Sequence, residues 1–274
     1  YYLRIKSIEE KMRKIFIVAI LLIVLVKQGT SQNSSNNQFA VDLLKQISAE
    51  EKGNIFFSPF SISAAMNMTF AGARGISQDQ ISMVFHFSSN SRKFHNKQGY
   101  FIKKISAKTD SIQLNIANKL WAEKTYPFKK SYTKLMKRSY SATVIPMDFI
   151  NKYEESRQTI NENIYKTTNE KIKDLLPEGS LNSLSRLVLT NAIYFKADWK
   201  IKFNKEKTSE SNFYVSPEKI TKCKMMGIKN DFNIYEDSKI KALELPYAGG
   251  NFSMLIILPA DNQPLDELTK SISN

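Results

Sequence analysis

The arrangement of apolar and polar residues is most informative over residues 187–195, where nearly every residue is apolar or β-branched. Side chains of a strand alternate between two faces, so this run predicts the middle strand of a large sheet that is covered on both sides. Asn191 is the exception, and it shares a face with Leu189 and Ile193. Its amide is expected to be buried and to need a partner. Two interpretations stay open here: a contact with a local backbone group, or a polar seam within a sheet that has to open.

Elsewhere the periodicity predicts helices in the first half of the chain and strands in the second. Helices are expected over residues 36–47, 62–73, 77–87, 92–105, 129–140 and 153–167, with strands at 55–57, 112–122 and 142–149. Further strands are expected over residues 187–203, 212–215, 220–226, 240–246 and 252–259, followed by an amphipathic segment at 264–273. Because strands and helices do not alternate regularly, the pattern favours an α+β fold.

The N-terminal region has the pattern of a secretory signal. Met12 opens a short basic stretch, an apolar run follows over residues 15–26, and small residues come next. This predicts a signal peptide over residues 12–31, with residues 1–11 as an upstream leader that is not part of the native protein. Twelve apolar residues are too few to cross a bilayer, which needs about 20, so no membrane span is expected. The mature protein, from residue 32 to 274, is expected to be secreted and extracellular.

The net charge of the chain indicates which class of binding partner to expect. The formal net charge is +14, and residues 1–31 contribute six basic and two acidic side chains to it, which leaves about +10 on the mature chain. In a secreted protein this favours polyanionic glycans or acidic surfaces over nucleic acid. A generally basic, soluble surface is the other interpretation.

Covalent modification is limited to one thiol and three sequons. Cys223 is the single cysteine, so an internal disulfide is not possible, and its alternation with Met225 predicts a side chain that points into the core. A reactive thiol is the alternative. Asn33 and Asn251 are candidate N-glycosylation sites, whereas Asn67 lies within an apolar helix and is not expected to be modified.

Several stretches resemble the serpin family of serine protease inhibitors. They are N-I-F-F-S-P-F-S-I-S-A-A-M at 54–66, I-N-E-N-I-Y-K-T-T-N-E-K-I-K-D-L-L at 160–176, L-T-N-A-I-Y-F-K-A-D-W-K-I-K-F at 189–203, and L-E-L-P-Y-A-G-G-N-F-S-M-L-I-I-L-P at 243–259. They occur in the family's order and at its spacing. The resemblance implies an α+β fold with three sheets, in which helices pack on a large central sheet that can accept an extra strand.

The resemblance also implies roles for individual residues. Ser58 and Ser61 match the family's shutter positions on the buried helix, and Asn191 matches their partner on the adjacent strand. This match favours the seam interpretation of Asn191. Trp199 matches the aromatic residue of the breach, the end of the sheet where insertion begins.

The linker between the overlying helix and the strand at 187–203 contains Thr168 and Lys171, at positions that the family also places there. Two residues depart from the family pattern. Ala197 stands where glycine is usual, and Asn163 stands where tryptophan is common.

This sequence also differs from the family pattern because it lacks several of the family's later segments. No segment before Asn274 resembles the family's small-residue hinge, its exposed reactive loop or the later strands. Residues 32–274 are therefore expected to be a partial serpin domain, whose seam lacks its histidine partner and whose apolar faces lack covers.

The function that the resemblance implies for the complete protein is inhibition of a serine protease, or a cysteine protease, as a suicide substrate. The protein is expected to be a monomer with no catalytic residue, cofactor or metal of its own. A non-inhibitory carrier, storage or glycosaminoglycan-binding protein is the alternative. A hydrolase is not favoured, because the two histidines, His86 and His95, form no motif; His86 is expected to be structural and His95 solvated.

A basic helix offers a further candidate site. Arg92, Lys93, Lys97 and Lys104 lie on the helix that binds heparin-like glycosaminoglycans in some serpins. A solvated basic face is the competing interpretation.

Overall fold

The computed structural model describes residues 22–23, 31–51, 53–106, 110–214, 219–260 and 265–272. The chain divides into two compact units. One is Pro59–Lys196, and the other combines the residues up to Ser58 with Ala197–Asn274. Together their helices and sheets form the α+β fold that the sequence predicts.

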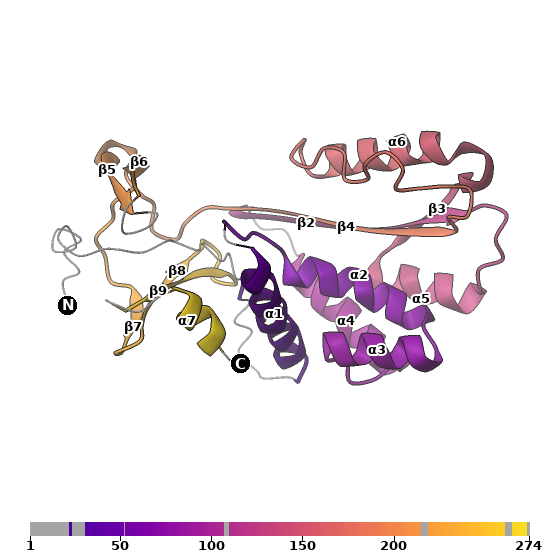
Figure 1. The fold of residues 1–274 in the computed structure, drawn as a ribbon, viewed down its shortest axis with the longest axis horizontal. Coiled ribbons are helices and arrows are strands. Elements are labelled where there is room, and N and C mark those ends of the chain that lie inside the picture. The colour runs from indigo at the N-terminus through magenta and orange to yellow at the C-terminus, as the bar shows by residue number, and fades with distance from the viewer. Residues whose placement is uncertain are drawn as a thin grey trace. The chain divides into compact units, whose positions relative to one another are not determined.

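The unit Pro59–Lys196 is built around a three-stranded sheet of order β3 (Thr143–Met147), β2 (Ile112–Glu123) and β4 (Leu187–Ala197) (Figure 1). Strands β2 and β3 are parallel. The N–H of Glu123 at the end of β2 donates to the carbonyl of Arg186, directly before β4, at 2.9 Å. Strands β2 and β4 therefore run in opposite directions. Among the described residues only β2 pairs with β4, and the position of β4 in the middle of a larger sheet stays a prediction.

Both faces of this sheet are covered. Leu120, Leu187 and Leu189 belong to a core shared with α2 (Pro59–Gly72), α4 (Arg92–Ile105) and α5 (Lys130–Tyr140). Trp121, Val188 and Ala192 belong to a second core under α6 (Phe149–Thr167). Figure 1 shows α6 along one face of the sheet and α2, α4 and α5 along the opposite face. The two apolar faces of the run at 187–195 thus have distinct partners.

The helical layer is closely packed at its centre. The side chain of Met68 on α2 and that of Met136 on α5 are fully buried. A Cβ atom added to Gly99 on α4 would lie 1.9 Å from the carbonyl oxygen of Ser139, so only glycine permits this approach of α4 to α5. Helix α3 (Gly75–Phe85) precedes α4 and ends at His86, which adopts a left-handed conformation with φ of 54°.

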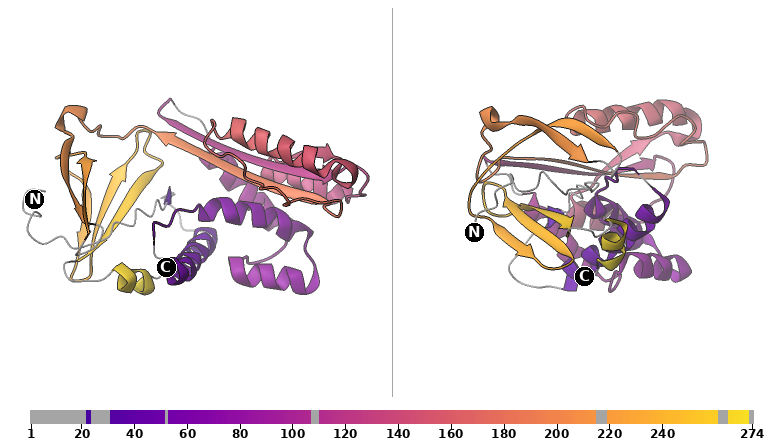
Figure 2. Two further views of the ribbon diagram at one scale, coloured as in Figure 1. Left: turned by 45° about the horizontal axis from the view of Figure 1, so that its top comes forward. Right: turned by 60° about the vertical axis from the view of Figure 1, so that its left-hand side comes forward.

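The second unit contains an antiparallel sheet of order β1 (Leu22–Ile23), β9 (Ser253–Pro259), β8 (Ile240–Pro246) and β7 (Asn233–Glu236) (Figure 2). Strands β5 (Ser209–Tyr214) and β6 (Ile220–Met225) form a separate two-stranded ribbon after a short 3-10 helix, Lys205–Lys207. Helix α1 (Ser31–Glu50) contacts α7 (Leu265–Ser271).

Most predicted elements are present with shifted ends, and two differences are substantive. Residues 55–57 form no strand, and the side chain of Phe56 is 79% exposed. Strand β7 was not predicted, because its four residues are all exposed and show no apolar alternation. The predicted leader (1–11) and the predicted signal peptide (12–31) lie outside the described residues, except for Leu22, Ile23 and Ser31.

Candidate functional site

A seam of polar side chains crosses the sheet on the face of α2. We define the polar seam as Ser61 on α2, Asn191 on β4 and Asn118 on β2. The hydroxyl of Ser61 donates to Oδ1 of Asn191. Nδ2 of Asn191 donates to Oδ1 of Asn118 at 2.6 Å. Nδ2 of Asn118 donates in turn to the carbonyl oxygen of Tyr140, the last residue of α5, at 3.0 Å.

The strand pattern explains this position of Asn191. Alternation along β4 directs it to the same side as Leu187 and Leu189, which pack against the helical layer. Its amide takes partners from two other elements rather than from a local backbone group. Asn191 is half-buried, whereas the sequence predicts a buried side chain. Because a buried amide that loses its partner costs about 1–3 kcal/mol, each member of the seam still constrains the others. Asn118 is 6% exposed and was not identified from the sequence, because its partners are far away along the chain.

The remaining predicted shutter and breach residues lie in the other unit. Ser58 is exposed and comes directly before α2 in the chain. The ring of Trp199 stacks on that of Tyr247, with centroids 4.5 Å apart and an angle of 12° between the planes. The backbone N–H of Lys200 donates to Pro246 at 2.9 Å, which ties the segment after β4 to the end of β8.

The linker between α6 and β4 begins with a buried threonine. Thr168 is 2% exposed; its hydroxyl donates to the carbonyl of Ile164 at 2.8 Å and accepts from the N–H of Ile172 at 3.1 Å. Lys171, the other predicted linker residue, is exposed. Between them, Asn169 and Glu170 have positive φ angles of 51° and 64°. A hydrogen-bonded turn therefore ends α6.

The linker is also held against the side of α6. Asn161 forms two hydrogen bonds with the backbone of Leu176, one to its carbonyl and one from its N–H, both at 2.8 Å. The guanidinium of Arg157 donates to the same carbonyl at 2.7 Å. These contacts were not predicted from the sequence, although Asn161 and Leu176 both belong to the family-like stretch at 160–176.

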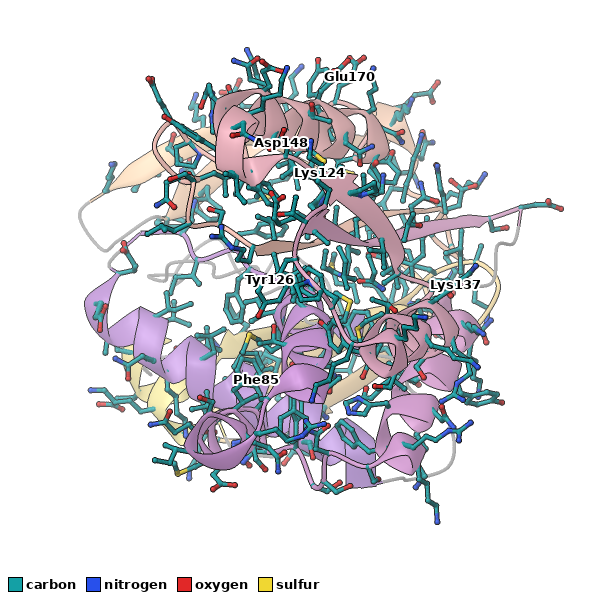
Figure 3. All side chains as sticks on the ribbon, turned by 90° about the vertical axis from the view of Figure 1, so that its right-hand side faces the viewer. Phe85, Lys124, Tyr126, Lys137, Asp148 and Glu170 are labelled. Carbon is teal, nitrogen blue, oxygen red and sulfur yellow. The ribbon has the colours of Figure 1, made fainter. Side chains whose placement is uncertain are left out.

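A buried carboxylate anchors the start of α6. Glu123 is 1% exposed, and its Oε2 accepts from the N–H groups of Phe149 at 2.7 Å and Ile150 at 3.3 Å. Burial alone would raise the pKa of Glu123, but hydrogen bonds from Thr125, Phe149 and Ile150 together hold it below its ordinary value. Beside it, Lys124 and Asp148 form an ion pair at 2.9 Å (Figure 3).

One polar bridge crosses the contact between the sheet and the middle of α6. Nζ of Lys119 on β2 donates to Oδ1 of Asn163, which lies near the C-terminal end of α6 and stands where the family commonly has tryptophan. The same ammonium lies 5.7 Å from the ring centroid of Trp121, and burial lowers its pKa. The indole N–H of Trp121 donates to Thr190 at 3.0 Å.

The predicted basic residues share the exposed face of α4. The members are Arg92, Lys93, Lys97 and Lys104. The neighbouring helix α5 adds the exposed side chains of Lys134, Lys137 and Arg138, and neither helix contains an acidic residue. Arg138 donates to Asn96 of α4 at 3.0 Å, so the basic side chains of α5 lie next to α4.

The two candidate glycosylation residues occupy different settings. Asn251 is exposed and follows Gly249 and Gly250, whose φ angles of 87° and 73° form the turn between β8 and β9. Asn33 lies in the first turn of α1. Asn67 is 3% exposed within α2. Cys223 is half-buried on β6.

The expectation for His95 is wrong. It was expected to be solvated, but it is 1% exposed and packs among aromatic rings, because it lies on the inner side of α4 beside Phe94. Among the described residues, no group of three or more histidine, cysteine or acidic side chains is placed to hold a metal ion. Within the same residues, no helix has the length and apolar character needed to cross a membrane.

Comparison with known proteins agrees with the motifs. The serpin (serine protease inhibitor) family matches residues 34–274. An uncharacterised serpin-like protein of Methanosarcina acetivorans is 40% identical over 232 residues, covering 84% of this chain and 55% of that protein. The structure of ovalbumin from emu, Dromaius novaehollandiae, has a TM-score of 0.83 and 30% identity, covering 89% of this chain and 67% of that chain.

An Arabidopsis serpin in a native stressed conformation is similar as well, with a TM-score of 0.77 and 30% identity over 89% of this chain and 65% of that one. This chain thus spans about half the length of the archaeal relative. The family match, the sequence identity and the shared fold cover the same part of the chain. We conclude that the chain belongs to the serpin family.

Proposed function

We propose that the complete protein is a secreted inhibitor of serine proteases that acts as a suicide substrate. Membership in a family of serine protease inhibitors supports the class of function. In this mechanism the protease hydroxyl attacks a peptide bond of an exposed loop, the amine of that bond leaves, and an acyl-enzyme ester forms. The freed loop then inserts beside β4 and carries the protease with it before water can hydrolyse the ester. The protein contributes no catalytic group.

The observation that carries this proposal is the polar seam at β4. The inserted loop would lie beside β4 as an added strand and pair with its backbone groups. At this strand the polar seam ties β4 to α2 and β2 through side chains, which can exchange partners when strands move. Ser61 and Asn191 are the residues that we assign to the shutter, with Ser58 as their neighbour in the chain.

Insertion beside β4 also requires α6 to shift, because α6 lies over the same sheet (Figure 1). We assign Thr168 and Lys171 to the segment that moves with it, and Trp199 to the end of the sheet where insertion starts. The native stressed conformation of the Arabidopsis serpin supports a trapped starting state for this reaction.

The proposal is tested by incubating the monomeric complete protein with a panel of serine and cysteine proteases. The proposal predicts an adduct that survives boiling in denaturant and is absent when the protease nucleophile has been blocked beforehand. Cleavage of the loop without any adduct would instead support a non-inhibitory carrier or storage protein.

A second candidate function is binding of a heparin-like glycosaminoglycan to the face of α4. The observation that favours it is the set of exposed basic side chains on α4 and α5, two helices that contain no acidic residue. Heparin retention that falls with salt and is weakened by Lys93→Ala with Lys97→Ala would support the site. The matched control replaces the exposed Lys205 and Lys207. Equal retention of both double variants would leave only a generally basic surface.

Secretion is proposed from the signal-like segment at 12–31, and glycosylation from Asn33 and Asn251. Expression in a secretory host, followed by N-terminal sequencing and glycosidase treatment, tests both. Cleavage near residue 32 is expected, together with a glycosidase-sensitive mass shift that Asn251→Gln reduces and that Asn33→Gln with Asn251→Gln abolishes. Retention of residues 12–31 in the cell-associated protein would contradict secretion.

A further inference from the structure

The polar seam continues beyond Asn118 into the helical layer. The carbonyl of Tyr140 accepts from Asn118, and the hydroxyl of the same tyrosine lies 2.6 Å from Nδ1 of His95. Nε2 of His95 lies 2.7 Å from Oδ1 of Asn90. One tyrosine therefore joins the seam on the sheet to an imidazole on α4.

This extension is buried. His95 and Tyr140 are each 1% exposed. The imidazole ring lies with its centroid 5.2 Å from that of Phe94 and 6.2 Å from that of Phe70. A polar chain in such surroundings is stable only when every donor has an acceptor.

The neighbouring contacts fix the tautomer of His95. Nδ2 of Asn90 donates to the carbonyl of Phe70 at 2.7 Å and to Oε1 of Gln78 at 3.1 Å. The amide oxygen of Asn90 therefore faces His95, and Nε2 of the imidazole must carry the proton. Nδ1 is then an acceptor, and the hydroxyl of Tyr140 donates to it.

Protonation of His95 is incompatible with this arrangement. The imidazolium donates from both nitrogens, so the hydroxyl of Tyr140 must become an acceptor and must turn its own proton elsewhere. Burial, followed by the positive charge of Arg74 at the start of α3, lowers the pKa of His95 to about 4. The other titratable neighbours lie on α5: burial raises the pKa of Tyr132 to about 12 and also raises that of Tyr140, so both are neutral.

We propose that the contact of His95 with Tyr140 is a pH-sensitive latch on the polar seam. When His95 is neutral, this contact holds Tyr140 at the end of α5. The carbonyl of Tyr140 then stays in place to accept the hydrogen bond from Asn118. In the protonated form Tyr140 reorients, Asn118 loses its acceptor, and Asn191 is held less firmly on β4. The inference concerns the regulation of the site in the proposed function, but its test involves no protease.

The experiment is hydrogen exchange of the peptide containing residues 187–197 in the full chain between pH 7.5 and pH 3.5, corrected for the intrinsic pH dependence. NMR titration of the imidazoles is followed in parallel. The latch predicts that exchange of β4 increases at least tenfold, with the same midpoint as protonation of His95. A peptide from β8 and β9 should show no step at that midpoint, which separates local opening from unfolding of the whole chain.

Three variants make the test specific. His95→Gln can hold both Asn90 and Tyr140 without titrating, so it should abolish the step. His86→Asn alters the only other histidine and tolerates a left-handed backbone, so it should retain the step. Tyr140→Phe keeps the ring but removes the hydroxyl, so the imidazole should titrate without changing exchange of β4.

Several results would overturn the latch. They are an imidazole of His95 that titrates near pH 6.5, a step that persists in His95→Gln, and a step that persists in Tyr140→Phe. If His95→Gln does not fold, the agreement of the two midpoints in the parent chain and the behaviour of Tyr140→Phe decide the question. Formation of protease adducts does not enter any of these readouts.

Discussion

On one face of the sheet, Asn191 and Asn118 form hydrogen bonds with α2 and α5, whereas on the other face Trp121, Val188 and Ala192 pack beneath α6 in largely apolar contacts. Hydrogen bonds are directional and fix which groups meet, while apolar contacts can be released and remade with little specificity. The first face therefore defines the position of β4, and the second acts as a cover.

The cover is held mainly at its two ends. At its start, Glu123 of β2 accepts from the first N–H groups of α6. Near its C-terminal end, Lys119 of β2 donates to Asn163, and Asn161 holds the linker that follows α6. We infer that α6 can lift in its middle while its ends stay attached.

The largest effects should come from emptying the core on either face. Ile160→Ala on α6 and Met68→Ala on α2 each remove a fully buried side chain, and each should lower the free energy of unfolding by about 3–4 kcal/mol. Chemical denaturation measures both. If α6 is a cover, Ile160→Ala should also speed exchange of the α6 amides more than Met68→Ala does. Equal effects on α6 exchange would remove the distinction between the faces.

Acid should act on the helical layer through His95. The pKa of His95 is lowered from 6.5 to about 4, so the free energy of unfolding has its full value above pH 6.5. It decreases as the pH falls below 6.5 and stops decreasing near pH 4. The loss amounts to about 3 kcal/mol at 1.36 kcal/mol per pKa unit. Denaturation at several pH values should show this slope in the parent and not in His95→Gln. A slope unchanged by that substitution would contradict the burial of a neutral imidazole.

The hydrogen bonds of the two faces can be compared directly. Asn191→Ala removes two hydrogen bonds, the one from Ser61 and the one to Asn118, and should cost about 2 kcal/mol. Thr190→Val leaves one indole N–H of Trp121 without its acceptor, and should cost about 1 kcal/mol. Equal losses in denaturation experiments would show that the seam has no special weight.

The smallest expected effect is a stabilisation at the end of α6. Glu170 has a φ angle of 64°, which costs a side chain about 1 kcal/mol relative to glycine. Glu170→Gly should therefore raise the free energy of unfolding by up to about 1 kcal/mol. The exposed Lys171→Gly is the control and should not stabilise. A loss of stability in Glu170→Gly would mean that its contact with Tyr165 outweighs the backbone strain.

Local signals predicted the elements well where they were strong. Residues 92–105 form the predicted helix with the same bounds, and Ser91 caps it by accepting from the N–H of Phe94 at 3.2 Å. The short apolar run at 55–57 formed no strand, because a strand also needs a neighbour to pair with, and a sequence pattern does not supply one.

The site was predicted only in part, for a similar reason. Ser61 and Asn191 come from family-like stretches, and the structure brings their side chains together. Asn118, Glu123 and His95 act through partners that are distant along the chain, so their types and spacing gave no signal. His95 in particular lies in a basic segment, and only the packing of α4 shows that it faces inward.

The central claim is that the sheet accepts, beside β4, a strand from the same molecule. The most direct measurement is hydrogen exchange of residues 187–197 in the complete protein, before and after an exposed loop is cut by a catalytic amount of protease. The account predicts that the cut protein protects the β4 amides at least a hundredfold more strongly and unfolds at a higher temperature. Unchanged protection of β4 after complete cleavage of that loop would contradict it.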